Sequence, residues 1–477
     1  SAASDVYKRQ ISSLPIFPGK SIFFIMRFYL KIMLSPLTLP PLKLRPRQNV
    51  RPPSSKSISN RVLLMAALSN SPCHLHHLLR SEDTEAMLSA LKILGIPCQQ
   101  LGQEEFLIRG QGGIFPVKEA ELFLHNAGTA YRSLCAILAL QQGQYILKGS
   151  DRMHERPIAP LVLALQSLGA NVDYLVKEGY PPLAIHPFHQ KDIQEINITG
   201  SVSSQFISAL LMALPLLNRP IQLTIEGELI SEPYVHLTLS LLTAFGIQLE
   251  IKNNRQFFSY GGQYYQAPRS YQVESDASSA SYFFAAAFLS NTSITVLGMD
   301  EKSEQGDWAF AHILSTLDGN LSKAPGAYTF SRHTPGKIEP FTLDATALPD
   351  AAMSLCIIAL LGKGTSRIEG ISSWRIKETD RIAAIATELK KLGARVTAGD
   401  DFIEITPPKQ LISGAHIATY EDHRMAMCFS LVALLGVSIT IEDPSCVRKT
   451  FPNFFQVLAH LTEPQATTGA APCYNKP

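Results

Sequence analysis

Residues 57–68 read SISNRVLLMAAL, a polar start followed by a run that is apolar on every face of a helix. A helix of that composition is buried on all sides. The pattern recurs as GTAYRSLCAILAL from residue 128, SSQFISALLMAL from 203, DASSASYFFAAAF from 276, PDAAMSLCIIALL from 349 and EDHRMAMCFSLVALL from 421. Successive starts lie 71 to 75 residues apart. The sequence therefore predicts six similar units between about residues 42 and 460, each built around a buried helix.

A second series of helical patterns keeps the same period. LKILG, LQSLG, LTAFG, LSTLDG and LKKLG end in glycine at residues 95, 169, 246, 319 and 393, and a strand-like run follows each. Glycine just past a helix adopts the left-handed backbone that ends it. Each unit should therefore contain two helices together with strands, which is an α/β fold.

The polar starts of the six buried helices suggest a binding site. The first turn of a helix carries unpaired N–H groups and the positive end of the dipole, which favour an anion by about 0.3–1 kcal/mol. If several starts converge on one cleft, they form a site for a small polyanion. The alternative is six ordinary N-caps on core helices.

Composition excludes several classes of protein. The chain has 477 residues, enough for two to four domains, with 42 Lys and Arg against 40 Asp and Glu. A net charge of +2 does not suit a duplex nucleic-acid binder. The seven cysteines are scattered without a C-x-x-C pair, which predicts neither a disulfide scaffold nor a cysteine zinc site and favours a reducing compartment.

The two ends of the chain differ from the repeats. The apolar run at residues 21–34 is interrupted by Arg27 and Lys31 and is too short to span a bilayer. We interpret residues 1–40 as an extension that is disordered or not native to the protein, and residues 466–477 as a C-terminal tail.

Nine motifs stand in register with the repeats. They are SKSISNR (55–61), NAGTAYR (126–132), RMHERP (152–157), SVSSQ (201–205), SEPY (231–234), LPDAAM (348–353), WRIKETDR (374–381), YEDHRMAM (420–427) and DPSCVRKTFP (443–452). In this order and spacing, from about Leu42 to Leu461, the sequence closely resembles the 5-enolpyruvylshikimate-3-phosphate (EPSP) synthase family. The resemblance implies two similar domains, each of three βαβαββ repeats with buried parallel helices, joined by a two-segment hinge. The first domain would be residues 41–55 plus 275–465, and the second, inserted, residues 56–274.

The resemblance also implies a reaction. The enolpyruvyl group of phosphoenolpyruvate is transferred to the 5-hydroxyl of shikimate 3-phosphate through a tetrahedral ketal, and phosphate is released, in the shikimate pathway of aromatic amino-acid biosynthesis. This chemistry needs a positioned acid–base pair and dense positive charge. By resemblance, Asp350 takes the hydroxyl proton, Glu378 protonates the phosphoenolpyruvate methylene, and Lys56 lies beside both substrates. Without the family, Asp350 could be an N-cap and Glu378 a solvated helix residue. The environment of a catalytic acid should raise its pKa.

The family's binding residues carry over to two sets. For shikimate 3-phosphate they are Lys56, Ser57, Arg61, Ser203, Ser204, Gln205, Ser231, Tyr234, Asp350, Ser373 and Lys377. For phosphoenolpyruvate they are Lys56, Asn126, Gly128, Arg156, Gln205, Arg381, Arg424 and Lys449. His423 either orients Arg424 or the phosphate, or is a satisfied structural histidine. We expect no cofactor, no metal, and no nucleic-acid or membrane partner, in a cytoplasmic monomer.

The WRIKETDR segment carries an argument independent of the family. Lys377 and Arg381 are four residues apart, and on one helix face their like charges would cost about 0.2–0.5 kcal/mol. Asp380 offsets part of that cost, and an anion held between the two cations would turn it into a gain. The alternative is a mixed-charge surface helix.

Four positions depart from the family pattern, and three other functions remain open. Ser54 and His125 stand where the family has Gly, Ser373 where it often has Asn, and Ser133 where it has the Pro beside the phosphoenolpyruvate and glyphosate pocket. A UDP-N-acetylglucosamine enolpyruvyl transferase would need a reactive Cys, and RMHERP has none. An RNA 3′-phosphate cyclase should show a basic face and a nucleotidylated His. A catalytically inactive anion-binding homologue would bind without turnover.

Overall fold

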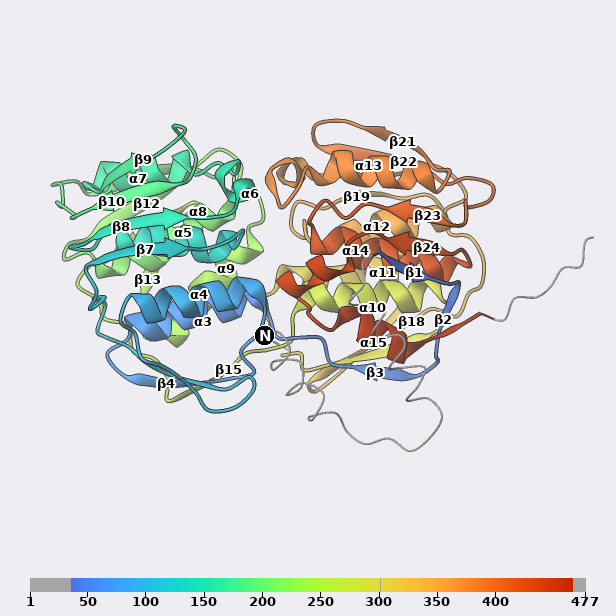
Figure 1. Cartoon of the computed structure of the whole chain (residues 1–477), viewed down its shortest axis with the longest axis horizontal. Helices are drawn as coiled ribbons and strands as arrows, with labels where there is room; N and C mark the ends of the chain where they lie inside the picture. The colour runs from blue at the N-terminus through green and yellow to red at the C-terminus, as the bar shows by residue number, and fades with distance from the viewer. Residues whose placement is uncertain (1–35, 301, 466–477) are drawn as a thin grey trace, which may run out of the picture.

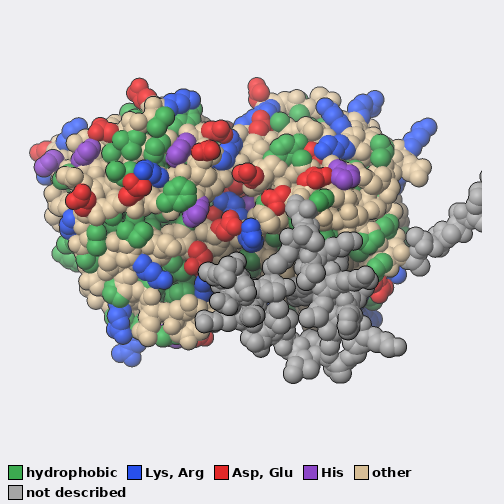
Figure 2. All heavy atoms as spheres, in the orientation of Figure 1, with side chains coloured by type: hydrophobic (Ala, Val, Ile, Leu, Met, Phe, Trp, Pro, Cys, Tyr) green, Lys and Arg blue, Asp and Glu red, His purple; other side chains and the backbone are tan. Residues whose placement is uncertain are grey.

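The computed structural model describes residues 36–300 and 302–465, which form two hydrophobic cores side by side (Figure 1). One core is made by residues between Ile58 and Val273, and we call this half lobe I. The other is made by Leu37–Val50 together with residues between Ala280 and Leu461, and we call it lobe II. Charged side chains of both signs are interspersed over the face shown in Figure 2, in keeping with the small net charge.

Lobe I contains three four-stranded sheets. Their strands, in spatial order, are β15 (Ser270–Gln272), β4 (Pro72–His76), β6 (Phe106–Arg109) and β5 (Cys98–Gln100); β7 (Glu119–Phe123), β8 (Gln144–Lys148), β10 (Leu183–His186) and β9 (Asn171–Tyr174); and β11 (Glu195–Thr199), β12 (Ile221–Glu226), β14 (Gln256–Ser259) and β13 (Leu249–Asn253). Its helices are α3 (Lys56–Leu68), α4 (Glu82–Ile93), α5 (Gly128–Leu138), α6 (Asp151–His154), α7 (Ala159–Leu168), α8 (Ser204–Ala213) and α9 (Pro233–Ala244).

Lobe II repeats this plan. Its sheets are β17 (Asn320–Ala324), β18 (Ala327–Ser331), β16 (Ser293–Leu297) and β3 (Gln48–Val50); β19 (Thr342–Asp344), β20 (Ser366–Glu369), β22 (Phe402–Thr406) and β21 (Arg395–Ala398); β1 (Leu37–Leu39), β24 (Ile439–Ile441) and β23 (Ala415–Ile417); and the pair β2 (Leu42–Leu44) and β25 (Thr462–Pro464). Its helices are α10 (Ala277–Leu289), α11 (Ala309–Asp318), α12 (Met353–Ile358), α13 (Arg381–Lys391), α14 (His423–Ser430) and α15 (Phe454–Leu461), with 3₁₀ turns η4 (Ser372–Ile376) and η6 (Pro444–Lys449).

Five of the six units have the expected βαβαββ connectivity. The sixth, around α14, has the parallel pair β23 and β24 and takes β1, from the N-terminal segment, as the antiparallel neighbour of β24. In the unit from β7 to β10, β7 and β8 are parallel, and β8, β10 and β9 pair antiparallel. In two units the first strand comes from a distant part of the chain. β3, which precedes lobe I in the sequence, pairs with β16 of lobe II, and β15, which follows the other strands of lobe I, pairs with β4. The chain therefore crosses between the lobes twice, and Ser54 and Ser275 in the two crossings form a β-bridge.

The six predicted buried helices are present as α3, α5, α8, α10, α12 and α14. α12 and α14 are shorter than expected because each continues as a 3₁₀ turn. Gly95, Gly169, Gly246 and Gly393 have the predicted left-handed backbone. Gly319 does not: it is extended, and the preceding Asp318 has φ 133° instead.

The predicted N-terminal extension is shorter than expected. Leu37–Leu39 form β1, which pairs antiparallel with β24 and buries Leu37 and Leu39 in the core of lobe II. The remainder of the extension up to residue 35, and the tail at 466–477, lie outside the described residues. Within the described part of the chain, the helices are too short or too polar to cross a bilayer.

Candidate active site

A cleft of about 810 Å³, its open mouth included, lies between the lobes. Its lining includes two carboxylates, Asp350 and Glu378, and seven cationic side chains: Lys56, Arg61, Arg132, Arg156, Lys377, Arg381 and Arg424. Both lobes contribute to it. Such an excess of positive charge in a partly enclosed space is suited to small molecules with several negative charges.

Several helix starts converge on the cleft, as the repeats predicted. α3 contributes Lys56 and Ser57, α8 contributes Ser204 and Gln205, and α14 contributes Arg424. The start of α10 does not line the cleft; there Asp276 caps the helix and the N–H of Ala277 donates to the Gln305 side chain.

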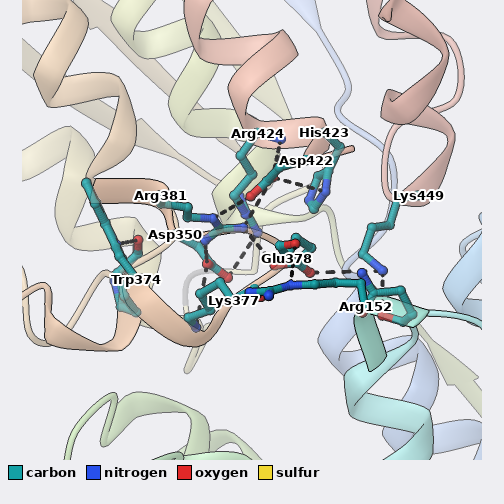
Figure 3. A network of polar contacts seen from close by, with 12 residues as sticks. Arg152, Asp350, Trp374, Lys377, Glu378, Arg381, Asp422, His423, Arg424 and Lys449 are labelled. Atoms are coloured by element: carbon teal, nitrogen blue, oxygen red, sulfur yellow. Dashed lines mark hydrogen bonds and ion pairs between the residues drawn. The ribbon is translucent and has the colours of Figure 1, made fainter. Parts of the chain in front are cut away.

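Arg381 is the centre of the charged network (Figure 3). Its side chain is 1% exposed and donates to Asp350 Oδ1 at 2.8 Å, to Glu378 Oε2 at 3.0 Å and to Asp422 Oδ2 at 2.7 Å. Three carboxylates around one buried guanidinium raise the pKa of Arg381 above its usual value, although burial alone would lower it. Arg381 therefore fixes both candidate acid–base groups relative to each other.

Asp350 is bound by both lobes. Arg424 donates to its Oδ2 at 3.0 Å, and the Tyr234 hydroxyl of lobe I reaches the same atom at 3.3 Å. Burial alone would raise the pKa of Asp350, but Arg424, Lys377 and Arg381 outweigh burial and hold it well below its usual range. Burial raises the pKa of Tyr234, and Asp307 and Asp350 raise it further.

Glu378 contradicts the expectation that a catalytic acid has a raised pKa. Burial acts in the expected direction, but Arg381, Arg156, Lys449 and Lys56 together hold the pKa of Glu378 well below its usual range. The sequence could not show this balance, because three of the four cations come from motifs remote from residue 378. Glu378 is thus a carboxylate whose proton affinity depends on what else these cations bind.

The WRIKETDR segment folds differently from the prediction. It is not one helix: η4 ends at Ile376, and α13 begins at Arg381. Lys377 and Arg381 share the anion Asp350, at 3.8 and 2.8 Å. Asp380 does not offset Lys377; its side chain caps α13 at the N–H of Ala383 and pairs with Arg375.

A second polar network joins the lobes beside Glu378. Lys449 Nζ of lobe II donates to Asp83 Oδ1 at 2.7 Å and to the Asn126 carbonyl at 2.8 Å. Lys56 is 3.2 Å from the same carboxylate, and Arg156 donates to Asn126 Oδ1 at 2.9 Å. The predicted residues Asn126 and Lys449 therefore lie just behind the cleft wall rather than on it.

Gly128 allows two guanidinium groups to approach the backbone of α5. A Cβ at this position would lie 2.5 Å from Arg132 Nη1 and 3.0 Å from Arg156 Nη2. The motif NAGTAYR contains Arg132, but the sequence did not single it out as a site residue. Burial, with Arg156 close by, lowers the pKa of Arg132 to about 9.

The residues predicted for shikimate 3-phosphate line one continuous part of the cleft. These are Lys56, Ser57, Arg61, Ser203, Ser204, Gln205, Ser231, Tyr234, Asp350, Ser373 and Lys377. Arg61 is held by Thr238 Oγ1 at 2.8 Å and Ser208 Oγ at 3.2 Å, and burial lowers its pKa to about 10. Burial also lowers the pKa of Lys377.

The structure contradicts one of the two roles considered for His423, that of a satisfied structural histidine. Both ring nitrogens are buried without a hydrogen-bond partner among the described residues, so the ring is not a satisfied structural histidine. Among the described contacts, the ring makes no hydrogen bond to Arg424, and its Nδ1 lies 3.6 Å from Asp422 Oδ1. Burial and the adjacent Arg424 hold the pKa of His423 well below its usual value.

Arg152 was also missed by sequence reasoning. From α6 of lobe I, its Nε donates to the Glu378 carbonyl and its Nη2 to the Lys377 carbonyl, each at 2.9 Å. These bonds tie the candidate catalytic segment of lobe II to lobe I (Figure 3). An arginine in an exposed four-residue helix gives no sequence signal of such a role.

Two lobes of βαβαββ units around a cation-lined cleft with an acid–base pair define a class of two-lobed transferases for anionic substrates. A sequence model described as EPSP synthase (3-phosphoshikimate 1-carboxyvinyltransferase) matches residues 45–458. The chain belongs to this family.

Curated relatives agree with that assignment, and solved structures agree with the fold. The chain is 49% identical over 431 residues to the 3-phosphoshikimate 1-carboxyvinyltransferase of Neisseria meningitidis serogroup C, covering 90% of this chain and 99% of the relative. It is 47% identical to the 3-phosphoshikimate 1-carboxyvinyltransferase of Thiobacillus denitrificans, and the match covers 88% of this chain and 98% of the relative. The structure matches EPSP synthase from Acinetobacter baumannii with a TM-score of 0.74 at 23% identity, covering 90% and 99% of the two chains. It also matches the enolpyruvyl transferase NikO from Streptomyces tendae with a TM-score of 0.70 at 14% identity, covering 90% of this chain and 98% of that chain. At such low identities a structural match supports the fold alone.

Proposed function

We propose that this chain transfers the enolpyruvyl group of phosphoenolpyruvate to the 5-hydroxyl of shikimate 3-phosphate and releases phosphate, a step of the shikimate pathway. The observation that carries the proposal is the pair Asp350 and Glu378, held on one buried arginine, Arg381, in a cleft rich in cations. Family membership supports the same reaction.

The cleft supplies binding groups for both substrates. Arg132, Arg156, Arg381 and Arg424 present planar guanidinium groups, which bind carboxylate or phosphate with two parallel hydrogen bonds. The cleft is also lined by the hydroxyls of Ser203, Ser204 and Ser231 and the cations of Lys56 and Arg61, which suit the phosphate of the acceptor, a cyclohexene carboxylic acid. Preorganised charge of this kind stabilises the negative charge of the ketal as it forms.

The two carboxylates divide the proton transfers. In the addition, Asp350 takes the proton of the 5-hydroxyl as its oxygen bonds to C2 of phosphoenolpyruvate, and Glu378 delivers a proton to C3. In the elimination these transfers reverse: Glu378 takes a proton from C3 as the C2–O bond to phosphate breaks, and Asp350 gives its proton to the departing phosphate. Substrate anions compete with Asp350 and Glu378 for Arg381, Arg424 and Arg156. Binding should therefore raise the pKa of both carboxylates towards values useful for acid–base work.

The lobes act together in this proposal. Tyr234, Lys449 and Arg152 each make a contact from one lobe to the other, so the described arrangement is closed across the cleft. We propose that the lobes are two hinged domains, whose closure excludes water from the ketal. Because one chain provides both walls of the cleft, we propose that the enzyme acts as a monomer, in the cytoplasm.

Phosphate release tests the proposal directly. Purified protein is given phosphoenolpyruvate with shikimate 3-phosphate in one reaction and with UDP-N-acetylglucosamine in another, with EDTA in both. We expect release with shikimate 3-phosphate alone, and a large loss in Glu378→Gln but not in Glu339→Gln, a surface control. Release with UDP-N-acetylglucosamine instead, or binding of shikimate 3-phosphate without release, would overturn the proposal.

A further inference from the structure

A cluster of two histidines and a glutamate lies outside the cleft, on the sheet of β4. His74 and His76 are two residues apart on β4 and therefore point to the same face of the strand. That face is not the core face, because the alternating residues Cys73 and Leu75 are the ones buried in the core. Glu105 directly precedes β6, which pairs antiparallel with β4 so that the register places Glu105 opposite His76.

The three side chains converge on one point. Their ligand atoms all lie within 4.8 Å of one another. His74 Nε2 is 3.6 Å from Glu105 Oε2, and His76 Nδ1 is 3.6 Å from Glu105 Oε1. These distances are longer than a hydrogen bond, which draws N and O to about 2.9 Å. In a tetrahedral zinc site the ligand atoms lie about 2.0–2.1 Å from the metal and therefore about 3.3–3.4 Å from one another. Shifts of a few tenths of an ångström would bring each of the two histidine–glutamate distances to that value.

Two further observations distinguish the cluster from a surface ion pair. Within the described residues, His74 Nε2 is shielded from solvent and has no hydrogen-bond partner. The two imidazole rings also lie close, with centroids 3.9 Å apart. A nitrogen that is hidden from water and unbonded costs free energy, and a metal ion would satisfy it.

The backbone beneath the cluster holds the ligands in place. β4 is bonded on both sides, to β15 and to β6, so it is an inner strand of its sheet. The N–H of Val273, in the second crossing between the lobes, donates to the carbonyl of His76. Ligands on paired strands are positioned more accurately than ligands on loops.

We propose that His74, His76 and Glu105 bind a divalent late transition metal ion, for which Zn²⁺ is the probe. Two imidazoles and a carboxylate are a donor set that Zn²⁺ accepts, with water completing the tetrahedron. The site is separate from the cleft and is independent of the proposed reaction. Bound metal would join β4 to β6 and so stabilise lobe I against unfolding.

Titration calorimetry with ZnCl₂ on the chelator-treated full chain tests the site. The variants are His76→Asn and Glu105→Gln, both changed on the solvent side of the sheet. His186→Asn is the matched control: His186 pairs with Asp173 at 2.9 Å on a different sheet, and the described residues offer no third ligand there. Loss of a residue that merely orients a metal ligand costs about 10–100-fold in affinity, so losing a ligand should weaken Zn²⁺ binding at least tenfold.

The expected result for the wild type is one bound Zn²⁺ per chain. Both cluster variants should bind Zn²⁺ at least tenfold more weakly, and the affinity of the control should equal that of the wild type. Zn²⁺ should also raise the Tm of the wild type and of the control more than that of either cluster variant, because a ligand specific to the folded state stabilises it. Equal Tm values of all variants without metal verify their folding. No saturable binding by the wild type, or equal affinity in all four proteins, would overturn the proposal.

Discussion

Replacing Arg152 by Ala should open the cleft without unfolding either lobe. Arg152 makes two hydrogen bonds from lobe I to the carbonyls of Lys377 and Glu378 in lobe II, both at 2.9 Å, and its side chain is 26% exposed. A hydrogen bond from a charged donor contributes about 1.5–3 kcal/mol, and partial exposure reduces this, so about 1 kcal/mol remains for each. The closed arrangement would lose about 2 kcal/mol, which is about thirtyfold in the equilibrium constant between the closed and open arrangements.

Steady-state kinetics measure this loss. We expect kcat/KM for phosphoenolpyruvate to fall about thirtyfold in Arg152→Ala, with a Tm close to that of the wild type, because no core contact is removed. The kcat/KM of Arg152→Lys should lie between those of the wild type and Arg152→Ala, since an ammonium group cannot reproduce both hydrogen bonds of the planar guanidinium. Arg367→Ala is the control: its side chain is similarly exposed, at 32%, but its ion pairs with Glu369 and Glu404 stay within lobe II. If kcat/KM of Arg152→Ala stays within threefold of the wild type, the reasoning about closure is wrong.

Four further predictions concern single residues in or near the cleft. Glu378→Gln removes the proposed proton donor and should lower kcat by at least about 100-fold. Binding of shikimate 3-phosphate, measured by fluorescence or calorimetry, should remain. A kcat within tenfold of the wild-type value contradicts the proposed role of Glu378. Arg381→Met leaves three carboxylates without their shared cation and should cost about 3–5 kcal/mol in urea unfolding, and a loss below 1 kcal/mol would show that the network is not structural. Burial and the nearby Asp350 raise the pKa of Asp307 to about 7, so the folded state keeps a proton there that the unfolded state loses near pH 4. This group should therefore lower the wild-type free energy of unfolding by up to about 1.4 kcal/mol per pH unit as the pH rises from 4 to 7. Asp307→Asn lacks this loss, so its stability relative to the wild type should rise over the same range. A difference in unfolding free energy that stays constant between pH 5 and 8 contradicts this. Ser133→Pro restores the proline of the family pattern and should increase inhibition by glyphosate, because proline inside α5 removes a helix N–H and shifts the backbone beside Gly128 and Arg132; identical inhibition curves would refute it.

The repeat and its buried helices could be predicted because both depend on local patterns. An all-apolar run such as residues 57–68 has one physical solution, burial, and its recurrence every 73 or so residues fixes the number of units. Even so, Gly319 failed as a helix stop, because Asp318 before it took the positive φ. The strand at Leu37–Leu39 was missed because three residues with a partner 400 positions away give no periodic signal.

The electrostatics of the site depended on contacts that are remote in sequence. The pKa of Glu378 is lowered by cations that include Arg156 and Lys449, from different motifs, so its direction could not be read from WRIKETDR. Arg152 contacts backbone carbonyls rather than side chains, which leaves no complementary residue type to recognise. The cluster at His74 and His76 likewise becomes visible only when the β4–β6 register brings Glu105 beside them.

The measurement that tests the central claim most directly is the reaction of phosphoenolpyruvate with shikimate 3-phosphate in D₂O, followed by proton and phosphorus NMR. If Glu378 protonates C3 in the addition and a proton leaves C3 in the elimination, the product's methylene must acquire deuterium from solvent as inorganic phosphate appears. We expect 5-enolpyruvylshikimate 3-phosphate with deuterium at that carbon, and none of it in Glu378→Gln over the same time. Product with a fully protonated methylene, or no product although shikimate 3-phosphate binds, would contradict the account.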